Sequence, residues 1–288
     1  MSTGLSIILS ILFLSITGIL MFFIIFHYQL QKAFQLPHVD CERHPRDFKL
    51  NWNEHILNVK DQKKLQLWEI PGAQSNLVFL GISGWNRAVD ALLPVATRLT
   101  GFGSVYLLNT RNHCKSSNSS FLSIVSFKKD MLEAYKYIKQ HHPGKRLVLV
   151  GHGYAAAVAL YAHDEIPEAD GLILSSVFPD LEEVVRQRFI DNKVPAAFLD
   201  NMTRFVEFRA GERFERVAPK KMLHRIKTPV ILYGKKDDLQ ILPDNPYIFK
   251  ADGKFLDGAF WQQEESVKPL IKFIRHIREH ALNLQKTA

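Results

Sequence analysis

LVLVGHGYAAAVAL, residues Leu147 to Leu160, reads as a buried strand, a sharp turn and the start of a helix. An unbroken apolar run of this length is typical of a strand covered on both faces. The turn has Gly153 at its apex, with His152 before it and Tyr154 after it. The question for the rest of the chain is which kind of fold places such a turn, and which side chains surround it.

Strand-like and helical segments alternate on either side of this stretch. Apolar strand-like runs occur in KKLQLWEI, NLVFLGIS, GSVYLLN, ADGLILSS and TPVILYG, separated by segments with helical spacing. This alternation indicates a parallel, doubly wound sheet with helices on both faces. We therefore expect one α/β domain over residues 51–288. The connection over residues about 178–227 is too long for an ordinary crossover and predicts a small helical cap.

The amino end predicts a membrane anchor. Residues 4–26 contain no charged side chain, and about 20 apolar residues are enough to span a bilayer as a helix. A cleaved signal peptide would need a basic start and a small-residue cleavage site, and neither is present. We expect one transmembrane helix over 4–26 and a juxtamembrane linker over 27–50. Lys32, Arg43 and Arg46 follow the span, so the positive-inside rule places the body in the cytoplasm.

Composition and charge limit the classes of molecule that the protein is expected to bind. The chain has 288 residues, a formal charge of +8 and two cysteines. A basic balance suits anionic partners such as lipid headgroups. Lys and Arg do not cluster with aromatic residues, so we expect no nucleic-acid binding. Cys41 and Cys114 are too few for a disulfide framework or a metal cluster, and we interpret them as unpaired thiols. We predict no metal and no cofactor.

The loops at the strand ends resemble, in order, those of the α/β-hydrolase superfamily over residues 63 to 280. GISGW resembles the first loop, with Gly81 at its glycine and the backbone N–H of Ile82 at the oxyanion position. NTRNHCKS resembles the next loop, which usually reads D-x-R-G-H-G-x-S, with matches at Arg111, His113 and Ser116. The turn at Gly153 resembles the nucleophile elbow G-x-S-x-G, with glycine where the family has serine and Ala155 at the second glycine.

The last two loops resemble those that carry the acid and the base of the family. Asp237 falls at the spacing of the acid. Gly258 and Ala259 match the loop that usually reads G-A-G-H, but Phe260 and Trp261 stand where its histidine would be. The segments around the cap are similar to the serine-aminopeptidase and acyl-esterase branch, whose members often carry an N-terminal membrane helix.

The hydrolase mechanism needs a serine nucleophile, a histidine base and an orienting carboxylate. Gly153 has no side chain, and Phe260 cannot accept a proton. Asp237 alone matches, as either an orienting acid or a solvated turn residue. Two side chains remain as alternative nucleophiles: Ser83 in the first loop, and Cys114 beside a histidine.

The anion-binding half of the site does not depend on those side chains. The backbone N–H groups of Tyr154 and Ala155 open a helix, and helix N-termini attract negative charge. With the N–H of Ile82 they could form an oxyanion-type nest. Such a pocket could hold an anionic or acyl small molecule.

The sequence thus favours a membrane-anchored α/β-hydrolase-fold protein that is catalytically degenerate and acts as a binding or interaction protein. In lacking the serine it is similar to the N-myc downstream-regulated proteins. The alternative is an active ester or lipid hydrolase with a non-standard nucleophile. A third possibility is a structural subunit that docks to another membrane protein. Membrane lipids are the expected partner of the N-terminal helix.

Overall fold

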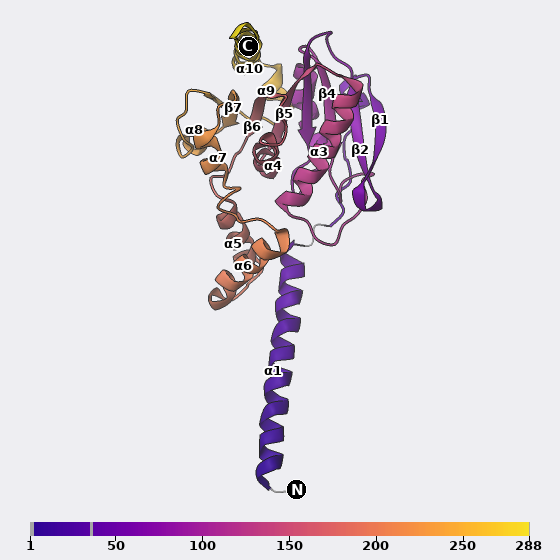
Figure 1. Ribbon diagram of the computed structural model, residues 1–288. Helices are drawn as coiled ribbons and strands as arrows, with labels where there is room; N and C mark the ends of the chain where they lie inside the picture. The colour runs from indigo at the N-terminus through magenta and orange to yellow at the C-terminus, as the bar shows by residue number, and fades with distance from the viewer. Residues whose placement is uncertain (1–2, 35–36, 288) are drawn as a thin grey trace.

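The computed structural model describes residues 3–34 and 37–287 as an α/β body on a long N-terminal helix (Figure 1). The strands are β1 Asn53–Val59, β2 Lys63–Ile70, β3 Leu77–Ile82, β4 Ser104–Asn109, β5 Arg146–His152, β6 Ala169–Ser175, β7 Val230–Gly234 and β8 Ile248–Asp252. The α-helices are α1 Thr3–Phe34, α2 Leu93–Leu99, α3 Ile124–His141, α4 Tyr154–His163, α5 Leu181–Asp191, α6 Leu199–Ala210, α7 Pro219–Arg225, α8 Lys236–Gln240, α9 Gly258–Gln262 and α10 Glu264–Thr287. Short 3-10 turns are η1 Pro45–Phe48, η2 Lys60–Gln62, η3 Val89–Leu92 and η4 Ala196–Phe198.

The eight strands form one sheet in the order β1-β2-β4-β3-β5-β6-β7-β8. β2 runs antiparallel to both of its neighbours, and the strands from β4 to β8 are mutually parallel. β3 and β7 are buried along their whole length, as their continuous apolar runs predict. The expected doubly wound sheet is confirmed, with one antiparallel hairpin added at its edge.

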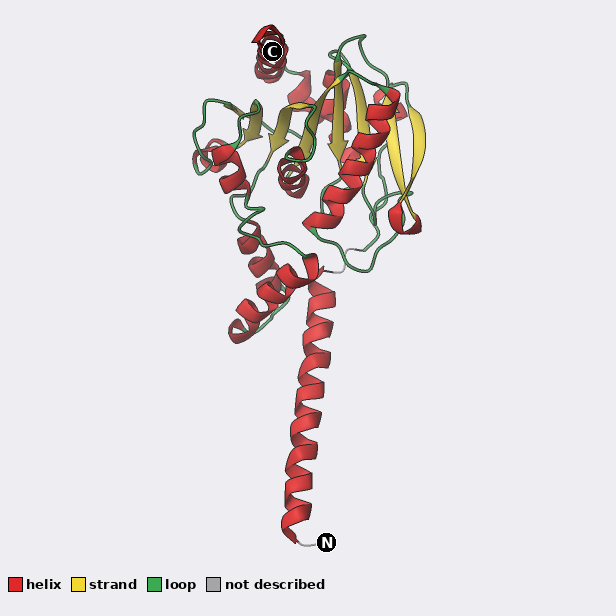
Figure 2. Cartoon of the chain, in the orientation of Figure 1, coloured by secondary structure: helices red, strands yellow, loops and turns green. Residues whose placement is uncertain are grey.

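Helices cover both faces of the sheet (Figure 2). On one face α3 and α4 pack over the inner strands in a core that includes Phe127, Met131 and Leu160. On the other face α2, α9 and α10 close a second core around Trp68, Trp261 and Phe273. Helices on both faces hold the central strands in place. Because these strands are parallel, their carboxyl ends lie on the same side of the sheet, and the turn at Gly153 follows the carboxyl end of β5.

The chain between β6 and β7, in which we expected the cap, folds as α5, η4, α6 and α7. α5 and α6 form a hairpin that projects from the body on the side where α1 leaves it (Figures 1 and 2). Asp180 caps the start of α5 by accepting a hydrogen bond from the N–H of Glu182. Gly211 ends α6 in the left-handed conformation at φ 72°, which glycine adopts at little cost.

α1 is long and apolar enough to cross a membrane over Gly4–Tyr28, 25 residues. A signal sequence passes the same test of length and composition. The helix continues to Phe34, so the segment expected as a linker begins as helix. Beyond the residues that are not described, Val39 forms a parallel bridge with His113, which ties the chain to the body.

The interpretation of the two cysteines as unpaired thiols was wrong. Cys41 and Cys114 form a disulfide, with their Cα atoms 5.3 Å apart, and the described chain holds no free cysteine. The carboxylate of Asp90, which is buried, accepts hydrogen bonds from the backbone N–H groups of Glu42 and Arg43 at 3.1 and 2.9 Å. The chain from Val39 to Arg43 is therefore fixed to the body both covalently and by hydrogen bonds.

Candidate ligand site at the β5–α4 elbow

The turn between β5 and α4 has the geometry of a nucleophile elbow. Gly153 lies at φ 57° and ψ −117°, a conformation that strains any residue with a side chain. Its N–H donates to the carbonyl of Ser175 at 2.9 Å, and its carbonyl accepts from the N–H of Ala156 at 3.1 Å. The turn is therefore held by the neighbouring strand and by the first turn of α4.

The glycine two residues before the apex is required by packing. A Cβ on Gly151 would lie 2.6 Å from the carbonyl oxygen of Ala155, so the start of α4 could not pack on the strand. Ala155 itself is fully buried. These two residues maintain the close approach of strand and helix, which needs no nucleophile.

The apex itself is open. A Cβ built on Gly153 has no heavy atom within 4 Å. A serine side chain would therefore fit in space, and its absence is a property of the sequence rather than a consequence of crowding.

A small cavity of about 200 Å³, here called the elbow pocket, lies at the apex. Its walls are the elbow residues 152–154, the loop that follows β3 with Trp85 and Arg87, and Leu256 from the β8–α9 connection. No sequence pattern indicates that Trp85, Arg87 or Leu256 lines a pocket. The first two are half-buried and exposed loop residues, and Leu256 lies in a connection far from the elbow in sequence.

The imidazole of His152 lines the elbow pocket, and its Nδ1 lies 2.8 Å from the hydroxyl of Ser175. Burial, together with the nearby charge of Arg87, lowers the pKa of His152 to about 4. The ring is therefore neutral at physiological pH. Ser175 is buried at the end of β6 and does not line the pocket, so the pair forms a structural link between two strand ends.

The base position holds no imidazole. Trp261 is buried, and its Nε1 donates to the carbonyl of Phe255 at 2.6 Å. Phe260 packs against the ring of Tyr233 and so closely over Gly253 that a Cβ at that position would lie 2.3 Å from its ring. Both rings belong to the core between α9 and the sheet, and neither lines the elbow pocket. The side chain that this connection contributes to the pocket is that of Leu256.

The acid position lies away from the pocket. Asp237 is in the first turn of the short helix α8, after β7, and its side chain is exposed. It is not among the residues that line the elbow pocket. The structure therefore does not bring Asp237 together with a histidine at the apex.

The two alternative nucleophiles are both occupied. Cys114 is bonded to Cys41, so it has no thiol. Ser83 is buried, its hydroxyl lies 2.7 Å from that of Thr110, and it accepts the N–H of Thr110 at 3.0 Å. Ser83 thus connects the ends of β3 and β4 and does not line the elbow pocket.

The matching residues of the second loop, Arg111, His113 and Ser116, hold that loop together. Arg111 binds the buried carboxylate of Asp130 through Nη2 at 2.6 Å and through Nε at 3.1 Å. Ser116 donates to the carbonyl of Asn109 at 2.6 Å. Burial lowers the pKa of His113, whose Nδ1 lies 3.0 Å from the carbonyl of Arg111. The three matching residues of this motif therefore have structural roles in the loop.

The backbone N–H groups of Ile82, Tyr154 and Ala155 were expected to bind an anion, and Ala155 is not among the residues that line the elbow pocket. Ile82 and Tyr154 both line the elbow pocket, and the N–H of the following residue, Ser83, donates to the carbonyl of Leu108 at 3.0 Å. Tyr154 begins α4, a helix of 10 residues.

Among the described residues no group of His, Cys, Asp and Glu could hold a metal ion.

A second cavity, here called the cap cavity, adjoins the elbow pocket and measures about 280 Å³. It lies between the body and the cap, and its lining is mostly apolar, with Val185 from α5, Val206 from α6 and Phe214. The two cavities share Trp85, Asn86 and Tyr154 as a common wall. Sequence patterns could not predict the cap cavity, because the cavity depends on how the cap packs against the body near the elbow.

Similar structures are hydrolases and an esterase. The Pyrococcus furiosus esterase Pf2001 is 20% identical and superposes with a TM-score of 0.60, covering 84% of this chain and 96% of its own. The α/β hydrolase GrgF from Penicillium sp. sh18 is 16% identical, with a TM-score of 0.56, covering 79% and 99%. An α/β hydrolase from Novosphingobium aromaticivorans is 13% identical, with a TM-score of 0.54, covering 78% and 99%.

The sequence matches no protein-family model and no curated protein. At these identities the structural likeness shows the fold. The expected fold is therefore confirmed: the chain has the α/β-hydrolase fold, preceded by one apolar helix long enough to span a membrane.

Proposed function

We propose that this chain is a membrane-anchored α/β-hydrolase-fold protein that binds a ligand without covalent catalysis. The observation that carries the proposal is the apex itself: the elbow has the positive φ of a nucleophile elbow at Gly153, but the glycine has no side-chain atom that could form an acyl-enzyme. Loss of the nucleophile removes the covalent route whatever the rest of the site retains.

The missing base supports the same proposal. His152 lines the elbow pocket, but its Nδ1 faces Ser175 and its lowered pKa makes it a poor proton acceptor. Leu256 stands in the pocket wall where the β8–α9 connection could have delivered a base. The apex has no nucleophile and the wall of the elbow pocket has no base, so the site is better suited to binding a ligand than to hydrolysing it.

The ligand class follows from the two joined cavities. The cap cavity offers a mostly apolar lining, which suits an acyl chain. The elbow pocket lies at the start of α4 and includes Arg87 in its lining, and both features suit a carboxylate or a phosphate. We therefore propose an amphiphile, with its chain beneath the cap and its anionic end at the elbow.

Membrane anchoring through α1 is part of this proposal. Two observations bear on which side of the membrane the α/β body lies. Positive charges after the span favour a cytoplasmic body. The disulfide between Cys41 and Cys114 favours the opposite side, because disulfides persist in oxidising compartments. Asn118 and Asn201, each in an N-x-S/T pattern, are exposed. We propose that the body faces a non-cytoplasmic compartment.

The test uses the full chain in phosphatidylcholine nanodiscs with a diazirine derivative of a long-chain fatty acid. Light-induced adducts should map to peptides that line the cap cavity. Ala210→Phe fills that cavity and should reduce these adducts at least several-fold. Ala259→Phe, the same change at an exposed position, should leave them unchanged. Equal labelling of both variants would refute the ligand site.

A fluorophosphonate probe distinguishes the hydrolase alternative. The non-catalytic proposal predicts no labelling of the purified full chain. Labelling that disappears in Ser175→Ala would show that the buried Ser175–His152 pair reacts, and the protein would be an enzyme with a displaced nucleophile. Labelling that disappears in Ser83→Ala would point to the other serine.

A further inference from the structure

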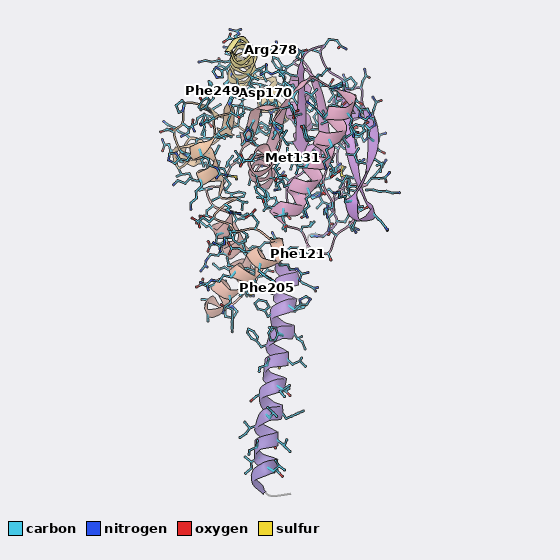
Figure 3. The ribbon with its side chains drawn as sticks, viewed as in Figure 1. Phe121, Met131, Asp170, Phe205, Phe249 and Arg278 are labelled. Carbon is cyan, nitrogen blue, oxygen red and sulfur yellow. A yellow bond between two sulfur atoms is a disulfide. The ribbon has the colours of Figure 1, made fainter. Side chains whose placement is uncertain are left out.

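Two aromatic contacts join the cap to α1. The ring of Phe198 lies 5.6 Å from that of Phe22, and the ring of Phe205 lies 5.2 Å from that of Phe26. Phe205 lies beside the end of α1 that is nearer the body (Figure 3). The α5–α6 hairpin therefore packs on the apolar helix as well as on the body.

These contacts fix the level of the hairpin relative to the segment that could span a membrane. At about 1.5 Å per residue, Phe22 lies about 27 Å along the helix from Gly4, and Phe26 about 33 Å. The hydrocarbon layer of a bilayer is about 30 Å thick. If that layer begins at Gly4, Phe198 and Phe205 lie at its far boundary.

The same hairpin carries large apolar side chains that are exposed. Ile190, Phe198 and Phe208 are exposed by 50%, 37% and 83% of their surface, whereas Val184, exposed by 39%, lines the cap cavity. Elsewhere on the described body, exposed side chains of this kind are scattered, at Ile56, Ile241 and Ile271. Exposed apolar residues that gather on neighbouring elements, here α5, η4 and α6, mark a surface with a partner.

We propose that the outer face of the α5–α6 hairpin docks on the surface of the bilayer that α1 spans. This inference rests on α1 being a membrane helix, as proposed above, and adds a second contact with the same membrane. Continuity with α1 identifies the partner: a surface that packs against residues 22 and 26 of a membrane span must meet the lipid beside that span.

Charges on the hairpin set its depth. Asp191, Lys193, Asp200 and Arg204 are exposed, and the first two flank the hairpin tip. Buried charge in hydrocarbon is costly, so the hairpin lies in the interfacial layer with its apolar side chains inserted among the upper acyl carbons. Because acidic and basic residues are mixed, binding depends on apolar contact rather than on anionic lipids.

Docking has a consequence for the cap cavity, whose walls include α5 and α6. The hairpin that covers the cavity would rest in the lipid interface. An amphiphile could then reach the cavity from the bilayer without passing through water.

The experiment exploits the absence of free thiols among the described residues. Ile190 and Ile241 are exposed isoleucines of equal accessibility, 50% and 51%, but Ile241 follows α8 on the body. Ile190→Cys, Phe208→Cys and Ile241→Cys, each in the full chain, are labelled with the fluorophore NBD and reconstituted in phosphatidylcholine vesicles. Leu14→Cys, in the middle of α1, reports whether the helix is inserted.

The proposal predicts blue-shifted emission and quenching by shallow nitroxide lipids at positions 190 and 208, quenching by deep nitroxide lipids at 14, and neither effect at 241. The effect should persist without anionic lipid and at high salt. Quenching at 14 with water-like emission at 190 and 208 would overturn docking while leaving the anchor intact. Water-like emission at all four positions would overturn both.

Discussion

The imidazole Nδ1 of His152 lies 2.8 Å from the hydroxyl oxygen of Ser175, and this contact joins the ends of β5 and β6 beneath the elbow. Burial lowers the pKa of His152 from its ordinary value of 6.5 to about 4 in the folded protein. As pH falls below 6.5 the unfolded chain binds a proton before the folded one does. The free energy of unfolding should therefore decrease between pH 6.5 and pH 4.

Replacing this histidine tests that pH dependence. His152→Gln keeps a hydrogen-bonding group for Ser175 but does not titrate. The wild type should lose up to about 3 kcal/mol over this pH window relative to the variant, less where solvent screens the ring. Chemical denaturation at pH 7 and pH 4.5 measures the difference. His113, whose pKa is also lowered, leaves a residual slope in both proteins, so identical slopes would contradict the prediction.

The backbone at the apex can be tested with a matched pair of glycines. A Cβ meets nothing within 4 Å at either Gly153 or Gly258, but only the former has a positive φ, at 57°. Gly153→Ala should destabilise the protein by about 1 to 2 kcal/mol through backbone strain alone. Gly258→Ala should cost much less. Denaturation curves of the two variants check this, and equal stability would mean that the elbow relaxes.

The sequence predicted the elbow well because the elbow is local. A buried strand, a glycine that packs on the helix and the start of that helix are adjacent in the chain, so their pattern specifies the turn. The five loops in hydrolase order predicted the sheet for a related reason: each follows its own strand. Local patterning therefore determined the fold and the place of Gly153.

What the sequence could not predict depends on contacts between distant segments. Cys41 and Cys114 are separated by 73 residues, and nothing near either one indicates that they meet. Ser83 looked accessible in a glycine-containing loop, but Thr110 and the sheet bury it. Leu256 lines the elbow pocket although it lies about 100 residues after the elbow, in the connection that follows β8.

The disulfide gives a stability prediction. Cys41→Ser with Cys114→Ser should lower the free energy of unfolding by about 2 to 4 kcal/mol, because the loop that the bond closes is long. In the wild type, maleimide-polyethylene glycol should modify the denatured protein only after reduction, with a gel shift for two thiols. Modification of unreduced, denatured protein would show that the bond does not form.

The last prediction concerns rebuilding the nucleophile. Gly153→Ser has room for its hydroxyl, because a Cβ at the apex meets nothing within 4 Å. It should nevertheless hydrolyse p-nitrophenyl esters no faster than the parent, since Leu256 occupies the pocket wall and Asp237 lies outside the pocket. Gly258→Ser serves as the control for background hydrolysis. Turnover by Gly153→Ser that His152→Gln abolishes would show that His152 can act as the base, and the site would then be one substitution away from an enzyme.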